Sequence, residues 1–222
     1  MCGIFGLIDN KTSINRTLFV DSLLKIKHRG PDHSGYNFIN ENIALGHVSL
    51  SIIDLNPNSN QPFQIDENYY LTYNGEIFNY LEIKEKLIDL GHKFITDGDT
   101  EVLLRSYIQW EKKCVNKFNG MWSFVIFDKK KNTFFCSRDR YGIKPFYYYY
   151  DNDKFIFASE IKSIINYFEE LNKPDFQSLY GYLYLNRGGE SSYTWFDGIK
   201  RLQPAHNLTL KNYKKKIFRY WN

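Results

Sequence analysis

The chain has 222 residues, of which 43% are hydrophobic and 18% aromatic, and its formal net charge is +4. This composition is typical of a globular protein with a sizeable buried core, and it excludes an intrinsically disordered chain. The mild positive charge gives no indication of binding to nucleic acid or to a membrane surface. We therefore expect neither nucleic acid nor membrane among the partners.

The cysteines indicate the compartment. Cys2, Cys114 and Cys136 are an odd count and contain no CxxC pair. This usage is typical of a reducing environment and argues against a disulfide framework or a zinc site. No signal-peptide pattern opens the chain, and no apolar run has membrane-spanning length. We therefore expect a cytoplasmic protein with no bound metal.

The predicted elements begin with a buried strand over 3–8 and a helix that includes 20–27. Strands over 43–54 and 69–75 follow, bracketed by Asn, Pro and Gly. Apolar residues at helical spacing then predict two helices. The first is marked by Tyr80, Ile83, Leu87 and Leu90 and ends at Gly91, and the second is marked by Leu103, Tyr107, Trp110 and Cys114. Further strands are predicted over 121–128, 133–139, 145–150, 154–160 and 211–219.

The later strands are nearly continuous apolar and aromatic runs. Strands of this kind are usually covered on both faces. Antiparallel hairpins stacked sheet on sheet, with helices outside, would cover them. The sequence therefore predicts an α+β fold, a four-layer α-β-β-α sandwich of two antiparallel sheets. We expect one domain over 1–205, with 206–222 as its end.

Four polar features allow a structural interpretation when each is taken alone. Cys2 fits a small apolar residue at the edge of the first strand. Asn74-Gly75 is a strong hairpin signal. Asp99 is placed to cap the helix that begins near Thr100, and Asn79 with Glu82 suggests another N-cap. None of these features identifies a function by itself.

Together, these features form a recognisable series. The segments "CGIFG", "HRGPD", "LSIIDL", "YNGEIFNY", "DTEV", "GMWSFVIFD", "RDRYGIKPFYY" and "FASEIKSI" occur in one order. The series resembles the N-terminal glutaminase domain of glutamine-hydrolysing asparagine synthetases, which are amidotransferases with an N-terminal nucleophile. The resemblance runs from Cys2 to about Trp221. It implies an α-β-β-α sandwich that hydrolyses glutamine to glutamate and ammonia.

The resemblance also implies a role for each matched residue. Removal of Met1 would leave Cys2 as nucleophile beside its own α-amino group, whose usual pKa of about 7.7–8.0 suits a base. The Asn74 amide and the Gly75 N–H would form the oxyanion hole. The other substrate-binding positions are Arg29 at the nucleophile end, Ser49, the backbone of Ser51, Ile52 and Ile53, and Glu76 and Asp99 for the α-ammonium group.

Ser49 departs from the family pattern. The family has "GHxRLSI", whose arginine binds the α-carboxylate of glutamine, whereas this chain has "GHVSLSI". A charge-assisted hydrogen bond contributes about 1.5–3 kcal/mol, so its loss would weaken binding by roughly 10- to 150-fold. Three readings stay open: another arginine replaces it, the glutaminase is poor, or the amide substrate differs. The alternative function is therefore a non-catalytic relative that serves as a regulatory or assembly module, or an enzyme for another amide.

A nucleotide-binding motif is missing from this sequence. Neither the family's "SGGxDS" loop nor a GxxxxGKS/T loop occurs. We therefore expect no cofactor in this chain, with ATP and Mg²⁺ bound only by an absent synthetase domain or subunit that accepts the ammonia. Residues 206–222 would lead into a linker towards that domain, and a homodimer is expected. The ammonia acceptor is not indicated, although aspartate is usual in the family.

Overall fold

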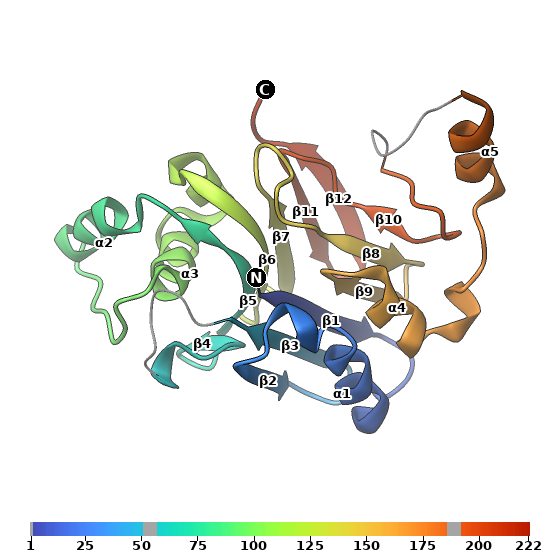
Figure 1. The fold of residues 1–222 in the computed structure, drawn as a ribbon. Coiled ribbons are helices and arrows are strands. Elements are labelled where there is room, and N and C mark those ends of the chain that lie inside the picture. The colour runs from blue at the N-terminus through green and yellow to red at the C-terminus, as the bar shows by residue number, and fades with distance from the viewer. Residues whose placement is uncertain (1, 51–56, 186–191) are drawn as a thin grey trace.

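The computed structural model describes residues 2–50, 57–185 and 192–222. Two six-stranded sheets form its centre (Figure 1). The first has the order β10-β8-β9-β1-β3-β2, and its strands are β1 (Gly3–Asp9), β2 (His33–Phe38), β3 (Ile43–Ser49), β8 (Tyr147–Tyr150), β9 (Lys154–Ala158) and β10 (Lys200–Arg201). The second has the order β12-β11-β7-β6-β5-β4, and its strands are β4 (Phe63–Ile65), β5 (Tyr69–Ile77), β6 (Gly120–Asp128), β7 (Thr133–Arg138), β11 (His206–Lys211) and β12 (Lys214–Arg219). Every strand pair is antiparallel.

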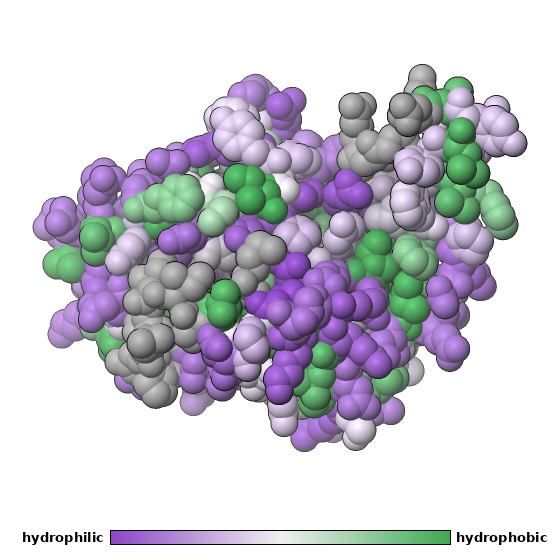
Figure 2. Space-filling view, viewed as in Figure 1, coloured by the Kyte–Doolittle hydropathy of each residue, from purple (hydrophilic) through white to green (hydrophobic). Residues whose placement is uncertain are grey.

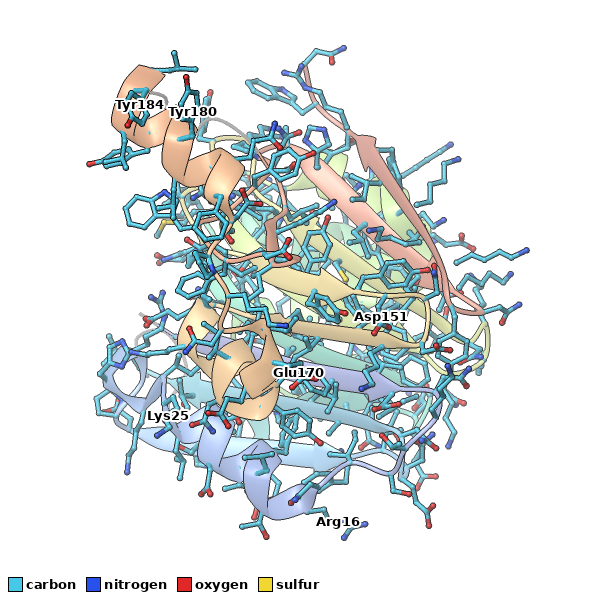
Figure 3. The ribbon with its side chains drawn as sticks, turned by 90° about the vertical axis from the view of Figure 1, so that its right-hand side faces the viewer. Arg16, Lys25, Asp151, Glu170, Tyr180 and Tyr184 are labelled. Carbon is cyan, nitrogen blue, oxygen red and sulfur yellow. The ribbon has the colours of Figure 1, made fainter. Side chains whose placement is uncertain are left out.

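Helices cover the outer face of each sheet, which confirms the predicted four-layer sandwich. The helices are α1 (Arg16–Leu24), α2 (Tyr80–Asp89), α3 (Asp99–Trp110), α4 (Ile161–Tyr167) and α5 (Phe176–Leu185). Helices α1 and α4 pack on the first sheet, and α2 and α3 pack on the second. Figure 3 shows α1 and α4 in front of the strands, and α5 at the upper edge, where Tyr180 and Tyr184 are labelled.

The position of β1, covered on both faces, explains why its sequence is apolar throughout. Ile4 and Ile8 point into the cluster between the two sheets, whereas Phe5 and Leu7 point outward under α1 and α4. All seven residues of β1 are buried. A strand in the middle of a sheet with both faces covered needs apolar side chains at every position. The same reasoning holds for β6 and β7, whose aromatic residues are divided between the inter-sheet cluster and the layer under α3.

The elements differ from the sequence prediction at several ends. Asn74 and Gly75 lie inside β5, not in a hairpin turn, because β5 continues to Ile77 and pairs with β6 along its whole length. Helix α3 ends at Trp110, where Glu111 has a φ of 50°, and Cys114 lies in a following 3₁₀ helix. Strands β11 and β12 occupy 206–219 and extend the second sheet.

Candidate active site

Cys2 lies directly before β1. Its Sγ is 3.7 Å from the carbonyl oxygen of Leu50. The Nε of Arg29 donates to the Cys2 carbonyl at 3.0 Å, and the Nη1 of Arg29 is 3.1 Å from Glu160. The start of the chain is therefore held by a side chain that is itself fixed by a carboxylate.

The Cys2 thiol faces a cavity of about 220 Å³. Sixteen described residues line this cavity: Cys2, His47, Ser49, Leu50, Ser59, Asn60, Gln61, Tyr73, Asn74, Gly75, Glu76, Gly98, Asp99, Thr100, Met121 and Lys144. Six predicted site residues from separate parts of the sequence therefore meet at one place. Arg29 does not line the cavity and touches Cys2 from behind. Ser51, Ile52 and Ile53 lie outside the described residues.

Asn74 and Gly75 present hydrogen-bond donors to this cavity. Asn74 is 1% exposed, and within the described part of the chain neither amide atom of its side chain has a hydrogen-bond partner. A buried amide without partners costs free energy unless a ligand satisfies it. A Cβ on Gly75 would lie 2.3 Å from the Met121 carbonyl oxygen, so only glycine fits there. The pair is thus placed as an oxyanion-binding site would be.

Asp99 is the first residue of α3, and its carboxylate does not cap the helix. Oδ2 accepts hydrogen bonds from the Tyr73 hydroxyl at 2.8 Å and from the Ile77 N–H at 2.9 Å. Burial raises the pKa of Asp99, and these two hydrogen bonds oppose that shift. Glu76 lies in the same cavity. The two carboxylates make this end suited to a cationic group such as an ammonium.

Asn79 precedes α2, as the N-cap interpretation expected, but its side chain does not cap the helix. Its Nδ2 donates to the Lys117 carbonyl, and its Oδ1 accepts from the Asn119 N–H at 2.8 Å. Asn79 therefore ties the start of α2 to the segment before β6.

The thiol itself is perturbed by its surroundings. Burial raises the pKa of Cys2, and among side chains the positive charge of Lys144 lowers it while Asp99 raises it. Lys144 is 6% exposed, and burial lowers the pKa of its ammonium group. Sequence reasoning assigned no role to Lys144, although the residue stands within the quoted segment "RDRYGIKPFYY".

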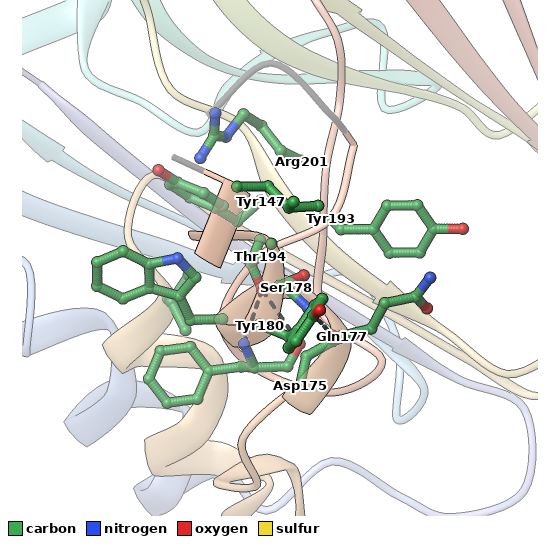
Figure 4. Close-up of a pocket in the computed structure, with 13 residues that line it drawn as sticks. Tyr147, Asp175, Gln177, Ser178, Tyr180, Tyr193, Thr194 and Arg201 are labelled. Carbon is green, nitrogen blue, oxygen red and sulfur yellow. Dashed lines mark hydrogen bonds between the residues drawn. The ribbon is translucent and has the colours of Figure 1, made fainter. Parts of the chain in front are cut away.

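A larger cavity of about 640 Å³ lies elsewhere, between α5 and the segment 193–196 (Figure 4). Tyr147, Tyr180, Tyr193, Trp195 and Phe196 are among the aromatic residues that line it. It contains none of the predicted catalytic residues. The smaller cavity is therefore the candidate active site, because the Cys2 thiol, the unpartnered amide and the two carboxylates line it.

None of the helices in the described ranges is both long and apolar enough to cross a membrane. Among the same residues, no group of three or more His, Cys, Asp or Glu side chains is arranged to hold a metal ion.

Comparison with known proteins gives one consistent family. The family model described as "Glutamine amidotransferase domain" matches residues 1–221. Glutamine-hydrolysing asparagine synthetase 3 of Bacillus subtilis is 36% identical, with all of this chain and 37% of that protein covered. Glutamine-hydrolysing asparagine synthetase B of Escherichia coli is 32% identical, with 89% of this chain and 36% of that protein covered. The chain thus spans well under half the length of these curated relatives.

A solved structure shows the same fold. Glutamine phosphoribosylpyrophosphate amidotransferase of B. subtilis, complexed with ADP and GMP, superposes with a TM-score of 0.72 at 17% identity. The match covers 98% of this chain and 49% of that one. The sandwich of two antiparallel sheets is therefore shared with an amidotransferase.

Proposed function

Because this chain belongs to the glutamine amidotransferase domain family, we propose that it hydrolyses glutamine to glutamate and ammonia with Cys2 as nucleophile. One observation carries the proposal. The Cys2 thiol, the unpartnered Asn74 amide and the Asp99 carboxylate share one cavity of about 220 Å³. This cavity offers the three groups that the chemistry needs: a nucleophile, an oxyanion donor and an anchor for the substrate ammonium.

The reaction begins with the free N-terminal residue. After removal of Met1, the α-amino group of Cys2 takes the thiol proton, and the sulfur attacks the side-chain amide carbon of glutamine. The C–N bond then breaks, the amide nitrogen leaves as ammonia with the proton returned from the α-amine, and a thioester remains on Cys2. Water hydrolyses the thioester to glutamate and frees the thiol.

Asn74 and Gly75 stabilise the tetrahedral intermediate. The negative oxygen accepts from the Asn74 side chain, which is buried, and from the Gly75 N–H; the backbone of both residues is fixed in β5 before substrate binds. Such preorganised donors stabilise developing charge without rearrangement during the reaction. Asp99 and Glu76 bind the α-ammonium group at the other end of glutamine.

Ser49 lines the cavity at the position of the expected arginine, so its short hydroxyl faces the substrate. A neutral donor binds a carboxylate less strongly than a guanidinium does. We therefore expect weaker binding of glutamine than in relatives that keep the arginine. This departure does not remove the nucleophile, the oxyanion donors or the ammonium site.

The proposal also includes an acceptor for the ammonia, which lies outside this chain. The relatives are asparagine synthetases of more than twice this length. We propose that an ATP- and Mg²⁺-dependent synthetase domain or subunit receives the ammonia, that the protein works in the cytoplasm, and that it forms a homodimer.

The first experiment measures glutamate formed from glutamine by the purified chain, with Cys2→Ala as blank. We expect turnover above the blank, because alanine cannot form the thioester. Removal of Met1 is verified by N-terminal mass determination, and Cys136→Ala serves as the matched control, since Cys136 is buried between the sheets. Equal rates for the chain and the blank, with Met1 removed and the fold intact, would overturn the proposal.

A further inference from the structure

Lys144 is a buried cation that the proposed reaction does not yet use. It is 6% exposed and lines the cavity that holds Cys2. Lysine is almost never fully buried unless its charge is paired. Within the described part of the chain, its Nζ has neither a hydrogen bond nor a salt bridge with a carboxylate. The protein therefore keeps a buried ammonium group, without a direct ion pair, in the cavity of its proposed nucleophile.

The backbone of Lys144 is fixed on both sides by two buried residues. The Lys144 N–H donates to Asp139 Oδ2 at 2.9 Å, and the same carboxylate also accepts from the Ile143 N–H at 2.9 Å. The Lys144 carbonyl accepts from Arg138 Nε at 2.7 Å. Arg138 is 7% exposed and Asp139 is fully buried. The loop between β7 and β8 therefore holds this lysine in place before substrate arrives.

Lys144 differs in charge and pairing from the other titratable groups around Cys2. The charged and titratable groups that face the thiol are Arg29 behind it, His47 on β3, Tyr73 and Glu76 on β5, Asp99 on α3, and Lys144. Arg29 is paired with Glu160. His47 is neutral, since burial lowers its pKa to about 3. The carboxylates of Glu76 and Asp99 disfavour a thiolate on Cys2. Among the described residues that line the cavity, Lys144 is the one whose positive charge favours a thiolate.

We propose that Lys144 is a positioning residue for the nucleophile, whose ammonium group stabilises the Cys2 sulfur as a thiolate facing glutamine. This inference rests on the proposed function of Cys2. The proton still moves from the thiol to the α-amino group of Cys2, and Lys144 keeps its own proton throughout. Its contribution is electrostatic, because a cation close to a thiolate favours the charged form.

The experiment follows alkylation of Cys2 by iodoacetamide against pH, in the chain without Met1, with mass spectrometry locating the label. An opposite charge nearby lowers a pKa by about one unit or more. We therefore expect Lys144→Met to raise the apparent pKa of the alkylation profile by about one unit and to slow labelling at pH 7 by roughly tenfold. Lys144→Arg should restore most of the rate, since it keeps the charge.

Three comparisons make the result specific. Lys216→Met removes the same charge from an exposed position on β12 and should leave the profile unchanged. Lys144→Gln is a second neutral variant if Lys144→Met fails to fold, as judged by circular dichroism. Labelling is read at Cys2 alone, because Cys114 and Cys136 are buried.

Alkylation does not require turnover, so the result is independent of whether glutamine is the substrate. An unchanged profile in a folded neutral variant would overturn the role of Lys144 even if the chain hydrolyses glutamine. A higher KM for glutamine with an unchanged profile would also overturn it, and would assign the cation to the substrate carboxylate. An inactive chain whose Cys2 profile still shifts in Lys144→Met would contradict only the proposed function.

Discussion

At the scale of single residues, Asn74 shows how the active site is built at a cost to the fold. Its side chain is buried, and both of its amide atoms lack partners among the described residues. A buried polar group without a partner destabilises a protein by about 1–3 kcal/mol. In the proposed reaction, the tetrahedral oxygen would supply the acceptor that the Asn74 amide lacks.

We predict that Asn74→Ala lowers kcat for glutamine by about 10²–10³ and changes KM little, because the lost donor acts mainly on the transition state. Steady-state kinetics of glutamate formation measures both constants. Asn207→Ala is the matched control, since Asn207 is also 1% exposed with both amide atoms unpartnered but does not line the cavity. A rise in KM with kcat unchanged would contradict the role in the oxyanion hole.

The residue types predict a chemistry for this site but do not predict its geometry. The motif positions of Cys2, Asn74 and Asp99 were assigned from the family resemblance. Local signals alone favoured a hairpin for Asn74-Gly75 and a helix cap for Asp99. The long pairing of β5 with β6 and the bonds from Asp99 to Tyr73 and Ile77 override those signals. The position of Lys144 in the cavity was not predicted, because its burial depends on the contacts of Arg138 and Asp139 that fix its loop.

At the scale of elements, β3 and β5 connect the two sheets beside the active site. The His47 Nε2 is 3.0 Å from the Tyr73 carbonyl oxygen, and the Thr72 hydroxyl donates to the Gly46 carbonyl at 2.9 Å. Because its pKa is about 3, His47 is neutral at pH 7 and donates this bond. The edge of the sandwich that carries Asn74 is therefore fixed by polar bonds between layers as well as by apolar packing.

The burial of His47, which lowers its pKa against the opposing effect of the bond to Tyr73, predicts a pH-dependent stability. Between the unfolded pKa of about 6.5 and the folded value of about 3, the unfolded chain binds a proton at His47 that the folded chain does not. Its contribution to the unfolding free energy is therefore complete above pH 6.5 and falls by about 1.4 kcal/mol per pH unit below it. We expect a loss of about 2 kcal/mol between pH 6.5 and 5 in urea denaturation.

His47→Gln tests this assignment, because a glutamine amide can donate to the Tyr73 carbonyl without titrating. We expect the variant to lose less stability than the wild-type chain over the same pH range. His92→Gln is the control, since the side chain of His92 contacts Gln109 at an exposed position. Parallel pH profiles for the wild-type chain and His47→Gln would contradict the buried neutral state of His47.

The elements themselves were largely predictable, and their ends were not. Continuous apolar runs predicted the strands that became β6, β7 and β9, because strands buried on both faces need such residues. Helix α3 ends before Glu111, which has a positive φ. Nothing in the residue composition predicts that φ value. Helix α5 was not predicted, since its apolar residues cover most of its circumference and give weak periodicity.

At the scale of the whole molecule, three apolar layers hold the sandwich together. One lies between the sheets, one under α1 and α4, and one under α2 and α3. The sequence predicted this layering, but it did not predict that β1 lies between β3 and β9, because the pairing of β1 with β9 joins segments about 150 residues apart. Helix α5 belongs to none of these layers.

The surface of α5 is exposed and apolar. Figure 2 shows hydrophobic side chains over this helix at the upper right. Phe176, Leu183 and Tyr184 are 77%, 71% and 74% exposed, and no residue of α5 is buried. Tyr180 and Tyr184 stack with ring centroids 4.7 Å apart. Clustered apolar side chains of this kind favour association in water, whereas scattered ones do not.

We predict that the purified chain self-associates through α5, because burial of this surface removes apolar area from water. Sedimentation velocity over a concentration series should show a mass that rises with concentration, and the double variant Leu183→Lys, Tyr184→Lys should reduce that rise. The matched control is Ile88→Lys, Leu90→Lys, which adds the same charge on and just after α2, where these side chains are 52% and 55% exposed. Because α5 lies outside the Cys2 cavity, the α5 variant should keep its glutaminase rate. If both double variants reduce association equally, net charge is responsible and the α5 surface has no special part.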